Sequence, residues 1–444
     1  MTVTFIEEDM QTKKQIMPFI PGAALIALLL FAYYAYTWHN AYNFRSAMDV
    51  CTKLFCDLAD YYYLMGEAIF QTKLPIEGYV YSPFIAILFA VFPPLGLDAS
   101  LLLWGVLQIL FVILYLFAFR RLVPARMPIQ LLFAALALSS FPILHNLKWG
   151  QVGIFYTVSI LGMLVFLERD RRAFAAALLA FAASFKFFPL IFILPFIFRR
   201  DFRFLLYAVV ACGGFLIVVP CLLLGIGSTL NFYSALLDSY RHFDWVMTSY
   251  NSQFFPHVML RLAKAAGFDH AMLQLAISAD FDPRAYFQIL RGIAYSIAAI
   301  NAGLVFWIQR ARLPNANLWA VHILFLLIPF VLPTSWPVDL VYLPFGQALL
   351  ACKILEGDNA LSWKHPLPAR KVAALLLLTS TVISNIVFFN IIGDRIAYGS
   401  VGFIFWADFL LLAVSCLELL PPALRHVGLA RSAGARPATA ASPG

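Results

Sequence analysis

Residues 98–119 read DASLLLWGVLQILFVILYLFAF, an apolar run long enough to cross the hydrocarbon core of a bilayer as one helix. Of the 444 residues, 62% are hydrophobic and only 12% are charged, about half of the charged fraction that is usual in soluble domains. The chain is therefore predicted to be an all-α polytopic membrane protein. Further runs of spanning length lie at about residues 18–38, 128–144, 151–167, 203–225, 285–308, 316–332, 337–352, 371–392 and 400–420.

Two stretches are ambiguous, and the charges of the loops decide how they are placed. Residues 81–94 are short for a span, and residues 173–198 form either one long span or two short ones broken at Lys186 and Pro189. If 81–94 stays on the outer side and 173–198 passes twice, three net basic loops become cytoplasmic, as the positive-inside rule expects. These loops are residues 120–126, 168–172 and 199–203.

This placement predicts about twelve spans and two long external loops, residues 39–97 and 226–284. The first of these loops is expected to carry juxtamembrane helices. The membrane domain is predicted to cover residues 1–420. Residues 421–444 are rich in Ala, Pro, Gly and Ser, which is typical of a disordered tail, here on the cytoplasmic side.

The formal net charge of +8 comes from basic residues in short loops, so it indicates topology rather than a nucleic-acid partner. Cys51 and Cys56 share the first external loop, where a disulfide is chemically permitted. No cysteine or histidine spacing resembles a zinc site, and no glycine-rich loop is placed to cradle a phosphate. The sequence therefore predicts no metal and no cofactor.

The first long polar gap holds two carboxylates among tyrosines. Asp57, Asp60, Tyr61 and Leu64 fall at helical spacing on one side of a predicted interfacial helix. A solvated face with an aromatic belt is the plain interpretation of this pattern. The functional interpretation is a catalytic base over the outer mouth of a membrane enzyme, because acidic groups beside a membrane are costly. On chemistry alone, Asp57 and Asp60 are equally good candidates.

Four further polar clusters are predicted on the same side of the membrane. A lysine flanked by phenylalanines, Lys186, is expensive at such a depth unless it snorkels to the interface or meets an anion. Together the clusters offer a carboxylate base, cations for a phosphate and aromatic platforms, which suits sugar transfer from a phospholipid-linked donor. The other three clusters contain Lys148 and Gln151, then Asn251 and Gln253, and finally Trp336 and Asp339, while Tyr79 and Tyr81 follow the two carboxylates of the first gap.

The chain resembles glycosyltransferase family 87, which includes polyprenyl-phosphate-mannose-dependent mannosyltransferases. The resemblance rests first on D-L-x-x-Y-Y-x-x-x-x-x-A at residues 57–68 and on Y-x-Y-S-P at residues 79–83. It continues in order through Gly150-Gln151-Val152, the Lys186-x-x-Pro189 break, Asn251-x-Gln253 and Ser335-Trp336. Two departures concern the acceptor and the sugar: Pro337 and Val338 follow the Ser-Trp pair where a His is common, and Gly153 stands where an Asn is usual.

The resemblance implies a GT-C fold and a metal-independent, inverting transfer. It favours Asp57 over Asp60 as the catalytic base and gives Lys186 the donor phosphate. Substrate-binding residues of the cavity are then expected to be Tyr61, Tyr81, Lys148, Gln151, Asn251, Gln253, Trp336 and Asp339.

The function expected from these patterns is a multi-pass enzyme of the cell membrane with its site on the outer face. It would move a hexose, with mannose favoured by analogy, from a polyprenyl-phosphate sugar to a lipid or glycan acceptor. The alternative is a transporter or flippase of lipid-linked glycans, which needs the same cations and aromatic side chains but no base.

Overall fold

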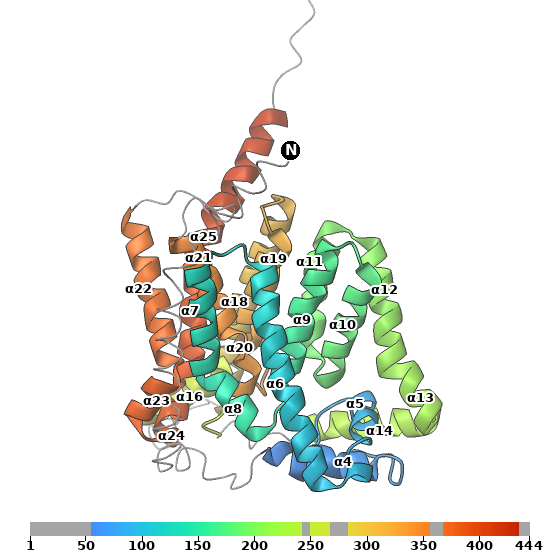
Figure 1. Ribbon diagram of the computed structural model, residues 1–444. Helices are drawn as coiled ribbons and strands as arrows, with labels where there is room; N and C mark the ends of the chain where they lie inside the picture. Colours follow the sequence, from blue (N-terminus) through green and yellow to red (C-terminus); the bar gives the residue numbers. More distant parts are fainter. Residues whose placement is uncertain (1–54, 242–248, 267–282, 356–366, 435–444) are drawn as a thin grey trace, which may run out of the picture.

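The computed structural model describes residues 55–241, 249–266, 283–355 and 367–434, and within these ranges the regular structure is helical (Figure 1). Five segments of the described chain are long and apolar enough to cross a membrane, or six if a bent pair of helices counts as one. A polytopic membrane protein is thereby confirmed, while twelve spans stay a prediction. The span predicted at 18–38 and the residue Cys51 lie outside the described ranges. The five segments are Leu97–Leu122, Phe202–Leu224, Tyr286–Arg310, Pro337–Leu355 and Arg395–Leu420.

The long segments are built from α6 (Leu97–Leu122), the continuous run of α12 (Phe202–Gly213), η4 (Gly214–Val218) and α13 (Val219–Leu224), and α18 (Pro283–Arg310). Shorter apolar helices fill the space between them. Among these, α9 (Gly153–Glu168) is buried on nearly all sides, as expected of a helix that is apolar all round.

Residues 81–94 do not span. Ser82 begins α5 (Pro83–Phe89) by accepting a 3.4 Å hydrogen bond from the Ile85 backbone N–H, and the segment ends in the short η2 (Pro93–Leu95). Seven helical residues cannot cross a bilayer.

The chain turns back within residues 173–198. Helix α10 (Arg172–Phe185) ends at Lys186, whose backbone is extended, and η3 (Phe188–Ile193) and α11 (Leu194–Arg199) follow. The η3 turn packs against α10, and in Figure 1 the chain then returns through α11 toward the end of the bundle where α10 begins. This is the broken hairpin that the sequence allowed as one of two alternatives.

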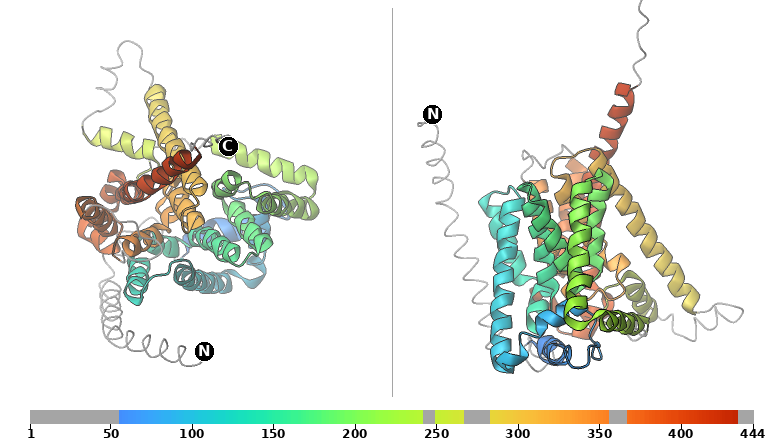
Figure 2. Two further views of the ribbon diagram at one scale, coloured as in Figure 1. Left: turned by 90° about the horizontal axis from the view of Figure 1, so that it is seen from above. Right: turned by 90° about the vertical axis from the view of Figure 1, so that its right-hand side faces the viewer.

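Short helices gather at one end of the bundle, which we call the Asp57 end (Figure 1). They are η1 (Leu58–Tyr62), α4 (Tyr63–Ala68), α14 (Ile226–Arg241), α16 (Phe255–Ala265), α23 (Ile386–Ile392) and α24 (Arg395–Val401). Figures 1 and 2 show α14 lying across the ends of the long helices. The Tyr240 hydroxyl on α14 donates to the Val80 carbonyl at 2.7 Å, which fixes α14 beside the 79–83 stretch.

The three basic loops lie together at the other end, which we call the arginine end (Figure 1). The lining of one cavity at this end includes Leu122, Glu168 and Arg200. Each of these residues belongs to one of the three basic loops. The loop charges therefore segregate to one end of the bundle, as predicted.

Helix α25 corrects one expectation. It runs from Phe403 to Gly434, so residues 421–434 are helical where a disordered tail is predicted. Ala423, Leu424 and Arg425, which follow two prolines, are strong helix formers. The average composition of residues 421–444 does not reflect this local helix propensity. Residues 435–444 lie outside the described ranges.

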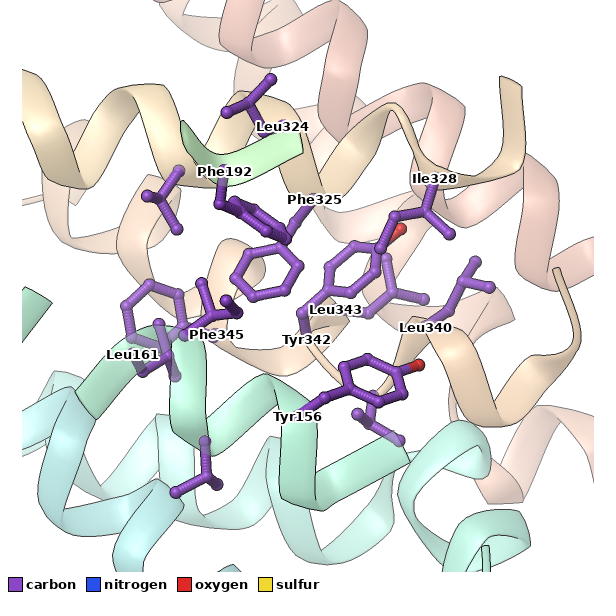
Figure 3. Packing of buried hydrophobic residues seen from close by; sticks show 14 of the residues in the cluster. Tyr156, Leu161, Phe192, Leu324, Phe325, Ile328, Leu340, Tyr342, Leu343 and Phe345 are labelled. Carbon is purple, nitrogen blue, oxygen red and sulfur yellow. The ribbon is translucent and has the colours of Figure 1, made fainter. Parts of the chain in front are cut away.

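Buried rings pack the centre of the bundle between the elements that carry the site. Phe192 of η3, Phe325 of α19 (Ala316–Leu326) and Tyr342 follow one another, with ring centroids 4.6 Å and 4.9 Å apart (Figure 3). In a membrane such close packing, rather than exclusion from water, holds helices together. These contacts hold η3 close to η5 (Pro337–Leu340). They thereby hold Lys186, two residues before η3, close to Asp339, which lies within η5.

Three buried ionisable groups of the described bundle, Lys353, Glu418 and Asp408, have a polar partner. Lys353 and Glu418 are buried with their charged atoms 3.7 Å apart, and the Tyr342 hydroxyl donates to Asp408 at 2.7 Å. Uncompensated charges at these positions would be costly.

Candidate functional site

A π-helical turn buries Asp57 and leaves Asp60 on the surface. The Tyr63 backbone N–H bonds to the Leu58 carbonyl, five residues back. In such a turn residues five apart point the same way, so Asp57 and Tyr62 both face the bundle. Asp60 and Tyr61 are exposed. The prediction that Asp57, Asp60 and Tyr61 share a face is therefore wrong, because it assumed an α-helical period.

Asp57 is the centre of a buried hydrogen-bond network. The Gln151 side-chain amide N–H donates to Asp57 Oδ2. The Gln151 amide oxygen accepts from the Tyr62 hydroxyl at 3.2 Å and from the Tyr81 hydroxyl at 3.3 Å, and the two hydroxyls lie 2.9 Å apart. All four side chains are less than a tenth exposed. The network joins the first loop, the 79–83 stretch and the turn between α8 (Phe141–Trp149) and α9.

The turn before α9 is built to hold Gln151. Gly150 ends α8 with φ +69°, and a Cβ there would lie 2.9 Å from Phe55 Cβ. The Gln151 backbone N–H donates to the Asn146 carbonyl at 3.0 Å, and its own carbonyl accepts from the Gln108 amide at 2.7 Å. With its backbone fixed on both sides, Gln151 carries its side-chain amide to Asp57.

The environment of Asp57 moves its titration toward neutral pH. Burial raises the pKa of Asp57 from 3.8 to about 7, against the hydrogen bond from Gln151 and the positive charge of Lys186, which both lower it. The negative charge of Asp60 adds a smaller increase. Burial also raises the pKa values of Tyr62 and Tyr81 well above their usual range, so both hydroxyls stay protonated and serve as hydrogen-bond donors.

A second buried carboxylate holds the lysine at the hairpin break. Lys186 Nζ lies 2.6 Å from Asp339 Oδ1, and the side chains are 11% and 0% exposed. The same oxygen accepts from the Tyr156 hydroxyl at 2.7 Å, and Asp339 Oδ2 accepts from the Trp336 backbone N–H at 3.0 Å. Asp339 therefore anchors the start of η5 as well as the lysine.

The two clusters form one site. The charges of Asp57 and Asp339 both contribute to raising the pKa of Tyr81, which places its hydroxyl within electrostatic reach of both carboxylates. Lys186 in turn acts on the pKa of Asp57. A buried carboxyl, a cation and several hydroxyl donors thus lie within electrostatic reach of one another.

Comparison with known proteins agrees with this geometry. The family model of glycosyltransferase family 87 matches residues 79–333, more than half of the chain. The chain belongs to this family. No curated protein and no solved structure gives a significant match.

The matched stretch holds part of the site of this membrane glycosyltransferase. Tyr81, Gln151 and Lys186 lie inside it, whereas Asp57 and Asp339 lie outside it, one on either side in the sequence. The fold brings both carboxylates against the matched residues.

Two of the other predicted residues, Gln253 and Lys148, have positioning contacts. The Gln253 backbone N–H donates to the Ser335 carbonyl at 2.7 Å, and its side chain bonds the Asn251 carbonyl at 3.2 Å and the Phe405 N–H at 3.0 Å. Gln253 is buried, so it ties the 249–253 loop to the Ser335-Trp336 turn and to α25. The Lys148 carbonyl accepts from the Phe55 N–H at 3.0 Å, which holds the chain just before Asp57.

The remaining three predicted residues lie at the edges of the site. Tyr61 is 39% exposed, and its ring lies against Gly78, where a Cβ would come within 2.6 Å of it. Asn251 and Trp336 are half-buried. The structure thus brings Tyr81, Gln151, Lys186 and Asp339 together with Asp57, and it leaves Tyr61 outside.

Sequence reasoning missed Tyr62, Tyr156 and Gln108. Tyr62 is adjacent to Tyr61, which the sequence predicted to line the cavity. The π-turn makes Tyr62 and not Tyr61 face inward. Tyr156 follows Gln151 by five residues in a mostly apolar helix that also carries Thr157 and Ser159, so nothing in that run distinguished it. Gln108 did leave a signal, an amide within the apolar run 98–119.

In the part of the chain that the structure describes, no three His, Cys, Asp or Glu side chains are grouped so that they could hold a metal ion. Cys56 is disulfide-bonded, and its partner lies outside the described residues.

Proposed function

We propose that this family 87 glycosyltransferase moves a hexose, with mannose favoured, from a polyprenyl-phosphate sugar to a lipid or glycan acceptor. The reaction would take place at the Asp57 end, on the outer face of the cell membrane, in a GT-C architecture and without a cofactor. The observation that carries the proposal is Asp57 itself, a buried carboxyl with a pKa of about 7 beside a cation and protonated tyrosines.

Asp57 would act as the general base. An acceptor hydroxyl attacks the anomeric carbon of the donor sugar, forming a new C–O bond as the bond to the phosphate oxygen breaks. The leaving polyprenyl phosphate keeps the electron pair, and Asp57 takes the hydroxyl proton. A base is most effective when its pKa lies near the working pH, and the burial of Asp57 provides that match.

Lys186 would stabilise the leaving phosphate. It lies at the break between α10 and η3, partly buried, and Asp339 holds its ammonium at 2.6 Å. An ammonium has three donors, so contact with one carboxylate oxygen leaves donors for a phosphate. Fixed cations at developing negative charge are among the strongest contributions to catalysis.

Family membership favours the enzyme over a transporter or flippase. The raised pKa of Asp57 also suits a general base that works near neutral pH.

The test compares Asp57→Asn with Asp60→Asn in membranes of a cell from which the gene has been deleted, so that the native acceptor is present. With a labelled polyprenyl-phosphate-hexose donor, Asp57→Asn is expected to lower product formation by about 10²- to 10⁴-fold while donor binding persists. The exposed Asp60 should tolerate the same change. Full product formation by well-folded Asp57→Asn would remove Asp57 from the role of base.

A further inference from the structure

The arginine end contains a cavity of about 680 Å³ that lies away from the Asp57 network. Four arginines line it: Arg199, Arg200, Arg310 and Arg312. They come from the two connections that follow α11 and α18, so two parts of the chain about 110 residues apart supply the same charge. The cavity is therefore formed by the tertiary fold and not by a single basic loop.

The lining is strongly positive. Its only carboxylate among the described residues, Glu168, is already paired with Arg121 at 3.6 Å, and Arg121 is not part of the lining. None of the four lining arginines forms an ion pair with a carboxylate of the described chain. Arg199 donates to the Asn317 side-chain oxygen at 3.0 Å. Guanidinium groups gathered around a cavity favour a phosphate, because they match its geometry with several donors.

A buried amide supplies a second, independent sign of a ligand. Gln309 lines the cavity although the residue is only 4% exposed. Its N–H₂ group donates to the Ala316 carbonyl at 3.1 Å and to Asn317 Oδ1 at 3.4 Å. Its oxygen Oε1 is buried and has no hydrogen-bond partner in the described part of the chain. An unpaired buried acceptor is costly, so a ligand that carries a hydroxyl donor would fit here.

Most of the remaining lining is apolar, and it lies at the ends of two candidate spans. Leu122 is the last residue of α6 and Arg310 is the last residue of α18, and both helices are membrane-span candidates. Leu164, Phe198 and Leu318 form apolar parts of the wall. An arginine-lined hollow with leucine and phenylalanine walls, at the end of two spans, suits an amphiphile better than a soluble anion.

We propose that this cavity binds the headgroup of an anionic phospholipid that carries a free hydroxyl. The phosphate meets Arg200 and Arg312, and a headgroup hydroxyl donates to Gln309 Oε1. The site is separate from the Asp57 network and does not depend on which sugar the enzyme transfers. It would couple the lipid composition of the leaflet at the arginine end to the packing of α6, α9, α11 and α18.

The test is native mass spectrometry of the purified full-length protein in detergent, titrated with phosphatidylglycerol or with phosphatidylcholine of the same acyl chains. The wild type is expected to retain phosphatidylglycerol in preference to phosphatidylcholine. Arg200→Gln with Arg312→Gln should weaken phosphatidylglycerol binding by about tenfold or more, the loss expected from two arginines beside an anionic headgroup.

The matched control is Arg171→Gln with Arg203→Gln. It removes the same charge from exposed positions at the same end that do not line the cavity, and it should bind as the wild type does. Gln309→Leu, which changes no charge, should weaken phosphatidylglycerol binding as well, because the hydroxyl loses its acceptor. Thermal unfolding of each variant checks that it is folded. If the double variant does not fold, the single variants Arg200→Gln and Arg312→Gln are measured in its place.

Three outcomes would overturn the proposal. An equal loss in the control pair would show only general attraction to basic loops. Equal binding of phosphatidylcholine would remove the preference for an anionic headgroup. Displacement of the lipid by millimolar inorganic phosphate would show that the site binds free phosphate and not a lipid.

Discussion

Lys186 Nζ lies 2.6 Å from Asp339 Oδ1, joining a lysine at the hairpin break to a carboxylate 153 positions later in the chain. Asp339 also accepts the Tyr156 hydroxyl and the Trp336 backbone N–H. Two residues that the sequence analysis assigned separately, one to the donor phosphate and one to the cavity wall, therefore form a single unit. Its carboxylate is fully buried and its ammonium is nearly so, so each charge depends on the other.

Replacing Lys186 should affect stability and donor binding through different partners. Lys186→Met leaves the buried Asp339 carboxylate uncompensated, which is expected to lower the free energy of unfolding by about 3–5 kcal/mol. Adding Asp339→Asn removes that charge and should restore most of the stability. If Lys186 also meets the donor phosphate, the double variant should still bind donor lipid weakly. The measurements are thermal unfolding and donor binding on the same preparations.

The single variant Asp339→Asn is the control for this pair, since it keeps the ammonium for the phosphate. Recovery of donor affinity together with stability in the double variant would show that Lys186 serves only the ion pair.

The rate of sugar transfer should rise with pH, with a midpoint near 7. A general base works only when it is ionised, and burial raises the pKa of Asp57 to about 7. The hydrogen bond from Gln151 stabilises the carboxylate and so lowers that pKa. Gln151→Leu should therefore shift the midpoint to higher pH, as measured by kcat/KM across a pH series.

Gln130→Leu is a suitable control for this pH series, because Gln130 bonds the Ala125 carbonyl at the arginine end. A midpoint that stays in place in Gln151→Leu would contradict the assignment of Asp57 as the titrating base.

Asp57→Asn should make the protein more stable above pH 7 although it abolishes transfer. The pKa of Asp57 is raised from 3.8 to about 7 on folding, so the folded state binds more protons than the unfolded state between these values. Stability from this group is thus greatest below pH 4, falls as the pH rises and is lost above about 7. Thermal unfolding should show Asp57→Asn above the wild type at pH 8, with a smaller difference at pH 5.

Asp60→Asn should show no such pH-dependent gain, since Asp60 is exposed. A stability difference for Asp57→Asn that is the same at both pH values would mean that the carboxyl is not protonated on folding.

The sequence predicted the membrane class, the short non-spanning segment at 81–94, the break at Lys186 and the clustering of the basic loops. These features depend on composition and on local breaks, because polar groups and prolines are hard to place within a lipid-spanning helix. The relation between Asp57, Asp60 and Tyr62 could not be predicted, because one turn with i→i+5 hydrogen bonds changes which side chains face inward.

The partners of the predicted residues were also beyond the sequence. Gln151 and Lys186 were found as single polar groups in apolar surroundings, and yet nothing in the chain indicates that Gln151 bonds Asp57 or that Lys186 meets Asp339. Both contacts connect residues more than ninety positions apart, and they depend on how α9 and η5 pack. Gln253 shows the opposite case, a predicted binding residue that the fold uses to tie loops together.

Gly153→Ala should impair both stability and transfer. A Cβ on Gly153 would come within 1.9 Å of the Val338 carbonyl oxygen and 2.8 Å of Asn146 Oδ1. The start of α9 and the backbone of η5 would have to separate, which is expected to cost about 1–3 kcal/mol. Since η5 carries Asp339, its displacement should loosen Lys186 as well, so donor affinity falls with stability.

Gly162→Ala on the same helix is the matched control, because its Cβ meets only the end of the Leu178 side chain at 3.0 Å. Thermal unfolding and donor binding of the two variants decide the matter: equal, small effects would show that the contact between Gly153 and η5 does not position the site.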